Sequence, residues 1–496
     1  MSRVLLIKAM RKAVLETGDS VAPPLGLLCL AAYANKVRPG KDQFTILDER
    51  IHPKTQKEWI AYIEELRPDC IGVSAMSADA GRVDALIPFL KKNFPNIPVV
   101  LGGPLASSAG PDLIKHIPAD YLVMGEGEKA FVSLLEMFEQ GLSHPGREIS
   151  GLAFSDPDGK TVCRPKNKDL IDIKSMPFPA YDLIDLMEYQ HQPRMTPMST
   201  KEPYAYIMTS RGCPYHCIYC HDIFSKKFRP MDALQVVDEI ERLITDFGIH
   251  EFEIIDDVFN LNKKRVLKIC SEIKRRGLKT AFTFPNGLRS DILDREVLEA
   301  LASVGTYHID IAVESASPRI QKLAKKNINL EKLEENAAIA SELGIFCWGF
   351  FMLGFPTETR REILKTLFWA WRSPMHGAFF FIVIPQEGTE LAREYCSKTP
   401  GGPKAGSSLY FNVKDSLAHV GATELRMYQS LAYLLFLCSP RRLWAIYRHV
   451  SKNGGRISGT LFRFLDYLFL HKLKSLAKQV WGAAAARFGQ GAGQKI

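Results

Sequence analysis

The sequence predicts an α/β protein built from two successive parallel sheets and a mostly helical C-terminal region. Short β-branched runs alternate with helical stretches through residues 1–150, and a second alternating series of six strands fills residues 201–395. Strands that alternate with helices indicate βαβ units, which form parallel sheets covered by helices. We therefore expect an open sheet in the first half of the chain and a partial or full (β/α) barrel in the second half.

The first 150 residues contain five candidate strands, which read RVLLIKA, FTILDER, CIGVSAM, PVVLGGP and YLVMGEGE. Ligands of such sheets bind at the carboxyl ends of the strands, where small residues let a ligand approach the backbone N–H groups. We expect cofactor contacts there from Ser74, Gly102, Gly103, Gly125 and Glu126. For the last two, the alternative is that the GEGE stretch is only a turn into the following helix.

Residues 151–200 are rich in Pro, Asp and Met, which predicts a linker with a small hairpin. The six strands of the second series then read YAYIMTS, EFEIIDD, TAFTFPN, YHIDIAVES, FCWGFFMLG and AFFFIVIP. Because barrel enzymes work at the carboxyl ends of their strands, polar residues at these ends predict a functional site. Those residues are Cys213, Cys217, Cys220, Asp256, Asp257, Asn286, Glu314 and Ser315.

Cysteine usage and hydropathy indicate the compartment. Of ten cysteines only those at 213, 217 and 220 are clustered, which is unlike a disulfide framework and predicts a reducing environment. The N-terminal apolar run is too short for a signal sequence, and no uncharged run reaches membrane-spanning length. We therefore expect a cytoplasmic protein.

The net charge of +9 is concentrated at the C-terminal end of the chain. From Arg426 onward the charge is +11, so the preceding 425 residues sum to −2, which argues against a nucleic-acid-binding protein. Residues 396–496 should be helical and include the segment LFRFLDYLFLHKLKSLAKQVW. Its aromatic, leucine and lysine residues lie at roughly helical spacing, so it could contact the inner membrane surface. The alternative is a basic, solvated helix face that caps the barrel.

The stretch RGCPYHCIYC gathers three cysteines at Cx3Cx2C spacing and supplies no fourth ligand. A structural zinc site closes with four protein ligands, and neither His216 nor His221 comes with a second C-x2-C knuckle. A cubane iron–sulfur cluster held by three thiolates leaves one iron free to bind another molecule. The sequence therefore favours an iron–sulfur cluster over a zinc-stabilised scaffold.

These motifs resemble those of the radical S-adenosylmethionine (SAM) superfamily, in the group that carries a cobalamin-binding domain. The Cx3Cx2C loop with Tyr219, then EIIDDVF, IAVESAS, LGFPTET and IPQEGTE, resembles the barrel of that superfamily. In the first half, APPLGLLCLAAY, VSAM, VVLGGPLA and VMGEGE resemble its Rossmann-like B12 domain. Alanine stands at 312 and 316, and threonine at 357, where the family commonly has glycine.

The resemblance implies a role for each residue of the site. Cys213, Cys217 and Cys220 would hold a [4Fe–4S] cluster that binds and cleaves SAM to a 5′-deoxyadenosyl radical. Asp256 or Asp257 would face the SAM amino group, and the alternative for this pair is a cap of the following helix. Glu314 and Ser315 would lie beside the ribose or methionine portion of SAM. A buried Glu314 should in any case have a polar ligand or a charge partner.

The same resemblance implies cobalamin as a second cofactor and narrows the reaction. The chain lacks a D-x-H-x-x-G string, so cobalamin would bind without a histidine on cobalt. The expected reaction is methylation of an unactivated carbon, and the alternative is a radical cyclisation, rearrangement or ring contraction without methyl transfer. The expected partners are a small-molecule or lipid-like substrate and a one-electron reductant such as flavodoxin or ferredoxin.

Overall fold

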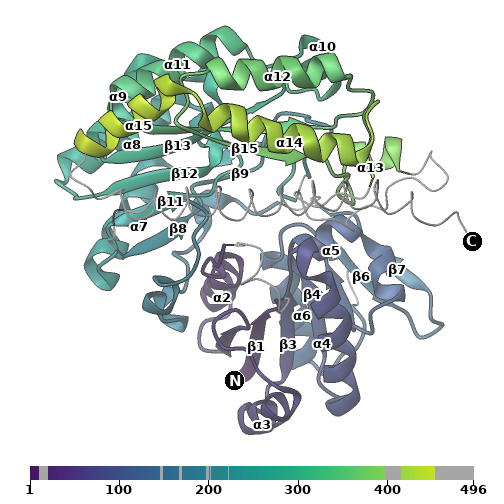
Figure 1. Ribbon diagram of the computed structural model, residues 1–496. Helices are drawn as coiled ribbons and strands as arrows, with labels where there is room; N and C mark the ends of the chain where they lie inside the picture. The colour runs from purple at the N-terminus through teal and green to yellow at the C-terminus, as the bar shows by residue number, and fades with distance from the viewer. Residues whose placement is uncertain are drawn as a thin grey trace, which may run out of the picture.

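The computed structural model describes residues 1–10, 20–145, 149–166, 170–196, 200, 203–221, 223–396 and 415–452, with side chains up to residue 446. Within these ranges all eleven strands expected from the sequence are present. The basic segment at 461–481, for which membrane contact or capping was expected, lies outside the described residues. Figure 1 shows the two sheets one above the other, with the first sheet in purple and blue.

The first sheet has the order β2-β1-β3-β4-β5-β6-β7. Its first five strands are parallel, and Val4 to Ile7 of β1 are at most 1% exposed, as expected for a strand covered on both faces. These strands are β1 (Ser2–Lys8), β2 (Asp42–Asp48), β3 (Cys70–Ser74), β4 (Val99–Gly102) and β5 (Tyr121–Val123). The order 2-1-3-4-5 places the topological switch point between β1 and β3, where open α/β sheets bind ligands.

In the described part of the chain, five helices accompany the first sheet. They are α2 (Leu25–Val37), α3 (Gln56–Leu66), α4 (Ala80–Asn93), α5 (Gly103–Ala109) and α6 (Glu128–Glu139). The hairpin expected between residues 151 and 200 is present as β6 (Leu152–Ser155) and β7 (Thr161–Cys163). It pairs antiparallel with β5 and so extends the first sheet, which is therefore mixed, whereas the strand–helix alternation alone indicated a parallel sheet.

The second sheet has six parallel strands in the order β15-β14-β13-β12-β11-β8, a partial (β/α)6 barrel. The strands are β8 (Tyr204–Ile207), β11 (Glu251–Ile254), β12 (Ala281–Leu288), β13 (Thr306–Glu314), β14 (Phe346–Leu353) and β15 (Gly377–Ile382). The helices between and after them are α7 (Ala233–Phe247), α8 (Lys263–Arg275), α9 (Arg295–Ser303), α10 (Pro318–Leu323), α11 (Leu330–Glu342), α12 (Arg360–Arg372) and α13 (Glu390–Tyr395).

The N-terminal end of this barrel is closed by the segment that precedes β8. Arg194 binds Glu251 at 2.5 Å and Glu253 at 3.0 Å, and Thr196 shares a hydrogen bond with Thr283. Except for Arg194, the side chains that form these contacts are completely or almost completely buried. The carboxyl ends of the strands are thus left as the working face.

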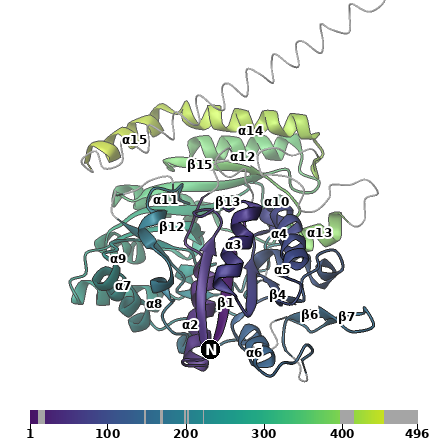
Figure 2. The same cartoon turned by 90° about the horizontal axis from the view of Figure 1, so that it is seen from below.

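The C-terminal helices α14 (Ala422–Leu437) and α15 (Pro440–Lys452) cover the last strand of the barrel. Gln429 and Tyr433 of α14 bond to the backbone of Phe380 on β15, and α14 also packs beside α12. Both views show α14 and α15 on the outside of the barrel (Figure 1, Figure 2). No helix among the described residues is long and apolar enough to cross a membrane.

Candidate active site at the carboxyl ends of both sheets

The three clustered cysteines lie in one loop between two short antiparallel strands, β9 (Ser210–Arg211) and β10 (Arg229–Pro230). Gly212 starts this loop with φ 84°, and a Cβ atom there would collide with the carbonyl oxygen of Lys227. Only glycine therefore lets the two arms of the loop approach so closely. The glycine directly before the first cysteine is therefore required for steric reasons.

The three thiols differ in exposure and in charge environment. Cys217 is 8% exposed, Cys213 is half-buried and Cys220 is exposed. A hydrogen bond between the sulfur atoms of Cys217 and Cys220, assisted by the nearby Lys326 ammonium, holds the pKa of Cys217 below its usual value despite burial. A lowered thiol pKa favours the thiolate, which is the form that binds metals.

Glu314, at the end of β13, has the charge partner that its burial demands. It is 6% exposed, it accepts a hydrogen bond from Tyr219 at 2.9 Å, and Lys326 lies 3.3 Å from the same oxygen. Burial would lower the pKa of Lys326, but Glu314 and the thiols outweigh burial and raise it. Glu314 also has φ 64°, a strained conformation of the kind that clusters at functional sites.

The two aspartates after β11 have different surroundings. Asp256 is 2% exposed and accepts hydrogen bonds from the Thr209 backbone at 2.5 Å, the Thr209 hydroxyl at 2.6 Å and the Ser210 hydroxyl at 2.5 Å. Asp257 is exposed, accepts a hydrogen bond from the Gly212 backbone and lies near Cys213. Asp256 therefore fixes the strand end below the cysteine loop, and Asp257 presents its carboxylate beside the cysteines.

The side chain of Ser315 is engaged by α12. It is 1% exposed, and its hydroxyl bonds Thr366 of α12 at 3.2 Å and accepts the Ser317 backbone N–H. The strand-end serine thus joins β13 to α12. A role for its side chain at the ribose or methionine portion of SAM remains a prediction.

On the first sheet, three of the expected contact residues meet at the ends of β3 and β4. Ser74 and Gly102 are paired in register, and a Cβ atom on Gly103, which has φ 85°, would lie 2.7 Å from the Ser74 hydroxyl. No bulky side chain rises from these positions. Small residues at these positions would let a ligand approach the backbone closely.

Gly125 and Glu126 are already engaged by protein groups. Gly125 donates its N–H to the Ser107 hydroxyl at 2.9 Å, and Glu126 forms a bidentate ion pair with Arg229. Two positions further on, the 5%-exposed Glu128 binds Arg211 at 2.6 Å. A direct cofactor contact from Gly125 or Glu126 remains a prediction, whereas the observed role of the GEGE stretch is to hold the base of the cysteine loop.

These ion pairs bring the two working edges together. Glu126 and Glu128 follow β5 of the first sheet, and Arg211 and Arg229 bracket the cysteine loop of the second. A further contact brings Gly388, after β15, so close to Ser108 of α5 that a Cβ atom would lie 2.8 Å from its carbonyl oxygen. The carboxyl ends of both sheets therefore face one another.

Sequence reasoning missed Lys326, Arg211 and Arg229, and it noted Glu128 only as part of the GEGE stretch. A signal for two of them existed, because arginines immediately before and after a cysteine loop predict partners of opposite charge. Lys326 lies in the loop after α10, and nothing in its sequence neighbourhood marks it.

The donor set fits an iron–sulfur cluster. A single zinc ion needs ligands that converge on one point, and the described residues hold no group of three or more His, Cys, Asp or Glu side chains so arranged. A cubane cluster spreads its thiolate ligands over separate irons, as three cysteines along one loop can do. The chain would hold the cluster through Cys213, Cys217 and Cys220, and cobalamin at the Ser74–Gly102–Gly103 edge.

Comparison with known proteins defines the class. Residues 207–370 match the radical SAM superfamily, and residues 11–135 match the B12 binding domain. The chain is therefore a radical SAM enzyme with an N-terminal B12-binding domain, and its cofactors are a [4Fe–4S] cluster, SAM and cobalamin.

Individual relatives support this class at a distance. An uncharacterized methyltransferase of Pyrococcus horikoshii is 29% identical over 79% of this chain and 82% of its own length. The cytidylyl-2-hydroxyethylphosphonate methyltransferase of Streptomyces wedmorensis is 28% identical over 77% of this chain and 76% of its own length. Other relatives are named as anaerobic magnesium-protoporphyrin IX monomethyl ester cyclases, a methylthiotransferase and a hopanoid C-2 methylase.

Solved structures show the same fold. The cobalamin-dependent SAM radical enzyme OxsB, with aqua-cobalamin and SAM bound, has a TM-score of 0.71 and covers all of this chain and 82% of its own. Its sequence identity is 16%, so this likeness concerns the fold alone.

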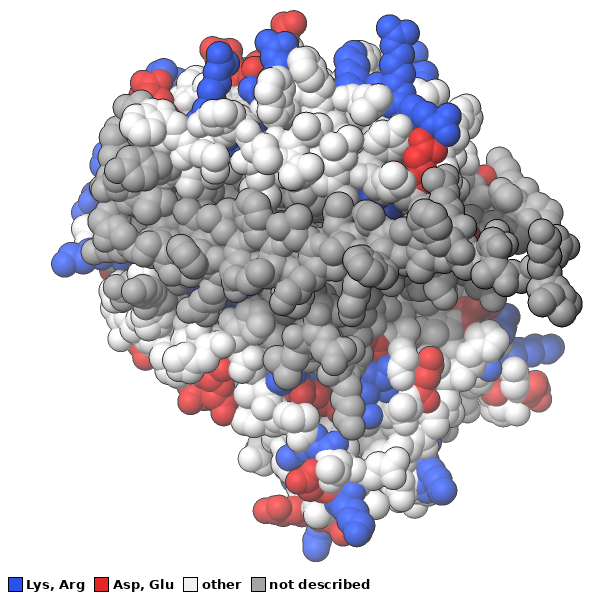
Figure 3. All heavy atoms as spheres, in the orientation of Figure 1, with Lys and Arg blue, Asp and Glu red and all other residues white. Residues whose placement is uncertain are grey.

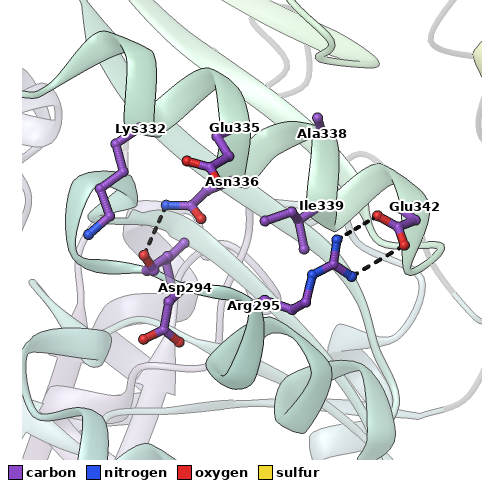
Figure 4. A pocket seen from close by; sticks show the side chains of 9 residues that line it. Asp294, Arg295, Lys332, Glu335, Asn336, Ala338, Ile339 and Glu342 are labelled. Carbon is purple, nitrogen blue, oxygen red and sulfur yellow. Dashed lines mark hydrogen bonds and ion pairs between the residues drawn. The ribbon is translucent and has the colours of Figure 1, made fainter.

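A cavity of about 380 Å³ lies apart from this site. It is formed between α9 and α11 in the outer helical layer, and the Arg295–Glu342 ion pair lies along it (Figure 4). None of the predicted site residues lines it.

Proposed function

We propose that this enzyme methylates an unactivated carbon atom of its substrate. The observation that carries the proposal is the apposition of the two edges, one bearing the cysteines and the other the small residues of the B12 domain. Methyl transfer requires both cofactors to reach one substrate carbon, which this arrangement permits. Several relatives are named methyltransferases, which further supports this reaction.

When bound, the reduced cluster supplies the electron that cleaves SAM to a 5′-deoxyadenosyl radical, and cobalamin supplies the methyl group. The residues of the chain bind and orient. Asp257 offers its carboxylate to the SAM amino group beside the cysteines, because Asp256 is saturated by Thr209 and Ser210. The Lys326 ammonium offsets the negative charge of Glu314 and the thiolates in a site with little water.

Radical cyclisation without methyl transfer is the second candidate, because relatives at 24–26% identity are named as cyclases. We also propose a small-molecule or lipid-like substrate and a one-electron reductant of the flavodoxin or ferredoxin kind. A relative named as a hopanoid C-2 methylase, 26% identical over 69% of this chain, supports the lipid-like class.

Labelling in cells distinguishes the two reactions. A host that expresses the chain anaerobically is fed methionine with a deuterated methyl group, and its extract is compared by mass spectrometry with that of a Cys217→Ala host. Methylation predicts a product that carries the intact deuterated methyl group in the wild type only. A wild-type-specific product without label would favour cyclisation and overturn the methylation proposal.

The purified chain provides the control for the cluster. After anaerobic reconstitution the wild type should bind about four iron atoms and release 5′-deoxyadenosine from SAM. Cys217→Ala should lose both properties, whereas Cys163→Ala, which changes an exposed cysteine on β7, should keep them. Deoxyadenosine formation by Cys217→Ala would contradict the cluster assignment.

A further inference from the structure

Three helices on the outside of the barrel expose an unusual number of large apolar side chains. In the described part of the chain sixteen such side chains are exposed, and nine of them lie on α12, α14 and α15. We call these nine side chains the apolar face. They are Leu364, Phe368, Trp371, Met427, Leu431, Leu434, Leu435, Leu443 and Trp444.

The apolar face consists of helical stripes. On α12 the exposed positions are spaced by four and three residues, and on α14 by four, three and one, so each set lies on one side of its helix. An adjoining side of α12 is buried on the barrel through Ile363 and Leu367. Figures 1 and 2 both place α12 and α14 side by side, and in Figure 3 the visible surface directly above the grey residues is mostly white, with blue and red side chains at its right end.

Arg442 holds this group of helices in place. It is 4% exposed and donates hydrogen bonds to the carbonyls of Ala370, Ser373 and Met375 at the end of α12. Its guanidinium also stacks 3.3 Å from the centre of the Phe436 ring on α14. Because one buried side chain ties α15 to both neighbours, the exposed stripes have a fixed relation to one another.

The charges around the apolar face are mostly positive. Apart from the buried Arg442, the described side chains of α12, α14 and α15 include five arginines and one lysine but only two acids. Both acids, Glu362 and Glu424, are already paired with arginines. On α12 the bases at 361, 365 and 372 lie beside the apolar stripe, since they follow its residues by one position or precede them by three.

We propose that α12, α14 and α15 form a docking surface for an anionic lipid bilayer. Apolar and aromatic side chains flanked by arginine and lysine are the combination that binds the interface of negatively charged membranes. A second copy of the chain fits less well, because a twofold contact would place these bases opposite one another. These three helices would lie in the interface between the membrane and water.

Vesicle sedimentation with the full-length, reconstituted chain tests this proposal. The wild type should bind vesicles of phosphatidylcholine with phosphatidylglycerol, and raised salt should weaken the binding. The variant Phe368→Glu/Met427→Glu/Leu434→Glu should bind at least about tenfold more weakly, because three apolar side chains no longer enter the interface. The matched control is Leu142→Glu/Met187→Glu/Leu234→Glu, which adds the same charge at other exposed apolar positions and should bind nearly as the wild type does.

A second variant, Arg361→Gln/Lys365→Gln/Arg372→Gln, tests the charges without changing the apolar stripe and should also weaken binding. Wild-type binding by the Phe368→Glu/Met427→Glu/Leu434→Glu variant would overturn the proposal. So would equal binding of the wild type to vesicles of phosphatidylcholine alone. Light scattering without vesicles completes the test. If the wild type does not bind vesicles but forms a dimer, and the Phe368→Glu/Met427→Glu/Leu434→Glu variant does not form this dimer, the apolar face would be assigned to a second copy of the chain instead.

Discussion

Glu239 on α7 is a buried acid beneath the candidate site. Burial, assisted by the neighbouring Asp256 carboxylate, raises its pKa to about 8 from an ordinary value of 4.5. At a pH between 4.5 and about 8, Glu239 keeps its proton in the folded protein and releases it in the unfolded chain. The free energy of unfolding contributed by this group therefore falls as the pH rises through this window.

We expect Glu239→Gln to remove this pH dependence. From about pH 5.5 to pH 7.5 the variant should gain about 2 kcal/mol of stability relative to the wild type. Urea unfolding at the two pH values measures the difference, and Glu334→Gln on the exposed side of α11 is the matched control. An equal difference between variant and wild type at both pH values would show that Glu239 is ionised in the folded protein.

Thr357 explains one departure of the sequence from its family. It occupies the position where glycine is common, and it has φ 60°, a conformation that is costly for a β-branched residue. Its backbone N–H binds Leu417 and its hydroxyl accepts a hydrogen bond from Arg319, so its surroundings hold it there. Threonine at this position therefore adds backbone strain that glycine would not carry.

Comparison of two variants measures this strain. Thr357→Gly and Thr357→Ala both lose the hydroxyl, but only glycine adopts positive φ without cost. The glycine variant should be more stable than the alanine variant by about 1 kcal/mol. Thermal unfolding of the two proteins provides the measurement, and equal midpoints would mean that the turn relaxes.

Among single residues, the cysteines were predictable because their chemistry depends on local spacing. Which of Asp256 and Asp257 presents its carboxylate beside the cysteines was not predictable, because adjacent residues at a strand end differ only in which neighbours fold against them. Thr209 and Ser210, which saturate Asp256, lie 47 and 46 positions earlier in the chain. Glu314 was expected to have a charge partner, and its identity as Lys326 depended on the loop after α10.

At the scale of elements, the cysteine loop is held by two buried ion pairs to the loop after β5. Removal of one partner leaves an uncompensated charge inside the protein, which typically costs about 3–5 kcal/mol. We expect Arg229→Ala to destabilise the chain by this amount, because Glu126 would remain buried. The double variant Glu126→Ala/Arg229→Ala should be more stable than the single one.

An exposed ion pair provides the control for this measurement. Arg295 and Glu342 lie 2.8 Å apart on α9 and α11, with about half of each side chain or more exposed (Figure 4). Their coupling energy should be at most about 1 kcal/mol. Urea unfolding of both double-mutant cycles yields the two coupling energies, and equal values would mean that the Glu126–Arg229 pair contributes no more than a surface contact.

The elements themselves were largely predictable, whereas their association was less so. Alternating β-branched and helical runs report local structure, and each of the expected strands is present. The sequence could not show that β6 and β7 join the first sheet, because strand pairing depends on an edge that only the folded sheet provides. The same holds for the GEGE stretch, whose arginine partners lie 83 and 103 positions away.

At the scale of the whole molecule, the fold places two cofactor edges opposite one another and leaves the apolar face on the outer side of the barrel. Ligands of parallel sheets bind at the carboxyl ends of the strands, and this rule predicted which edge of each sheet would carry the site. It carried no information on how the two sheets face each other. That relation comes from Glu126, Glu128, Arg211 and Arg229, together with the close approach of Gly388 to α5.

The same four side chains also relate the order of synthesis to the order of assembly. Glu126 and Glu128 leave the ribosome before the cysteine loop does, and N-terminal domains generally fold first during synthesis. When the loop emerges, the acids that receive its arginines already stand on a formed sheet. The first half of the chain thus serves as a template for the second, and iron can be loaded onto a loop whose ends are already fixed.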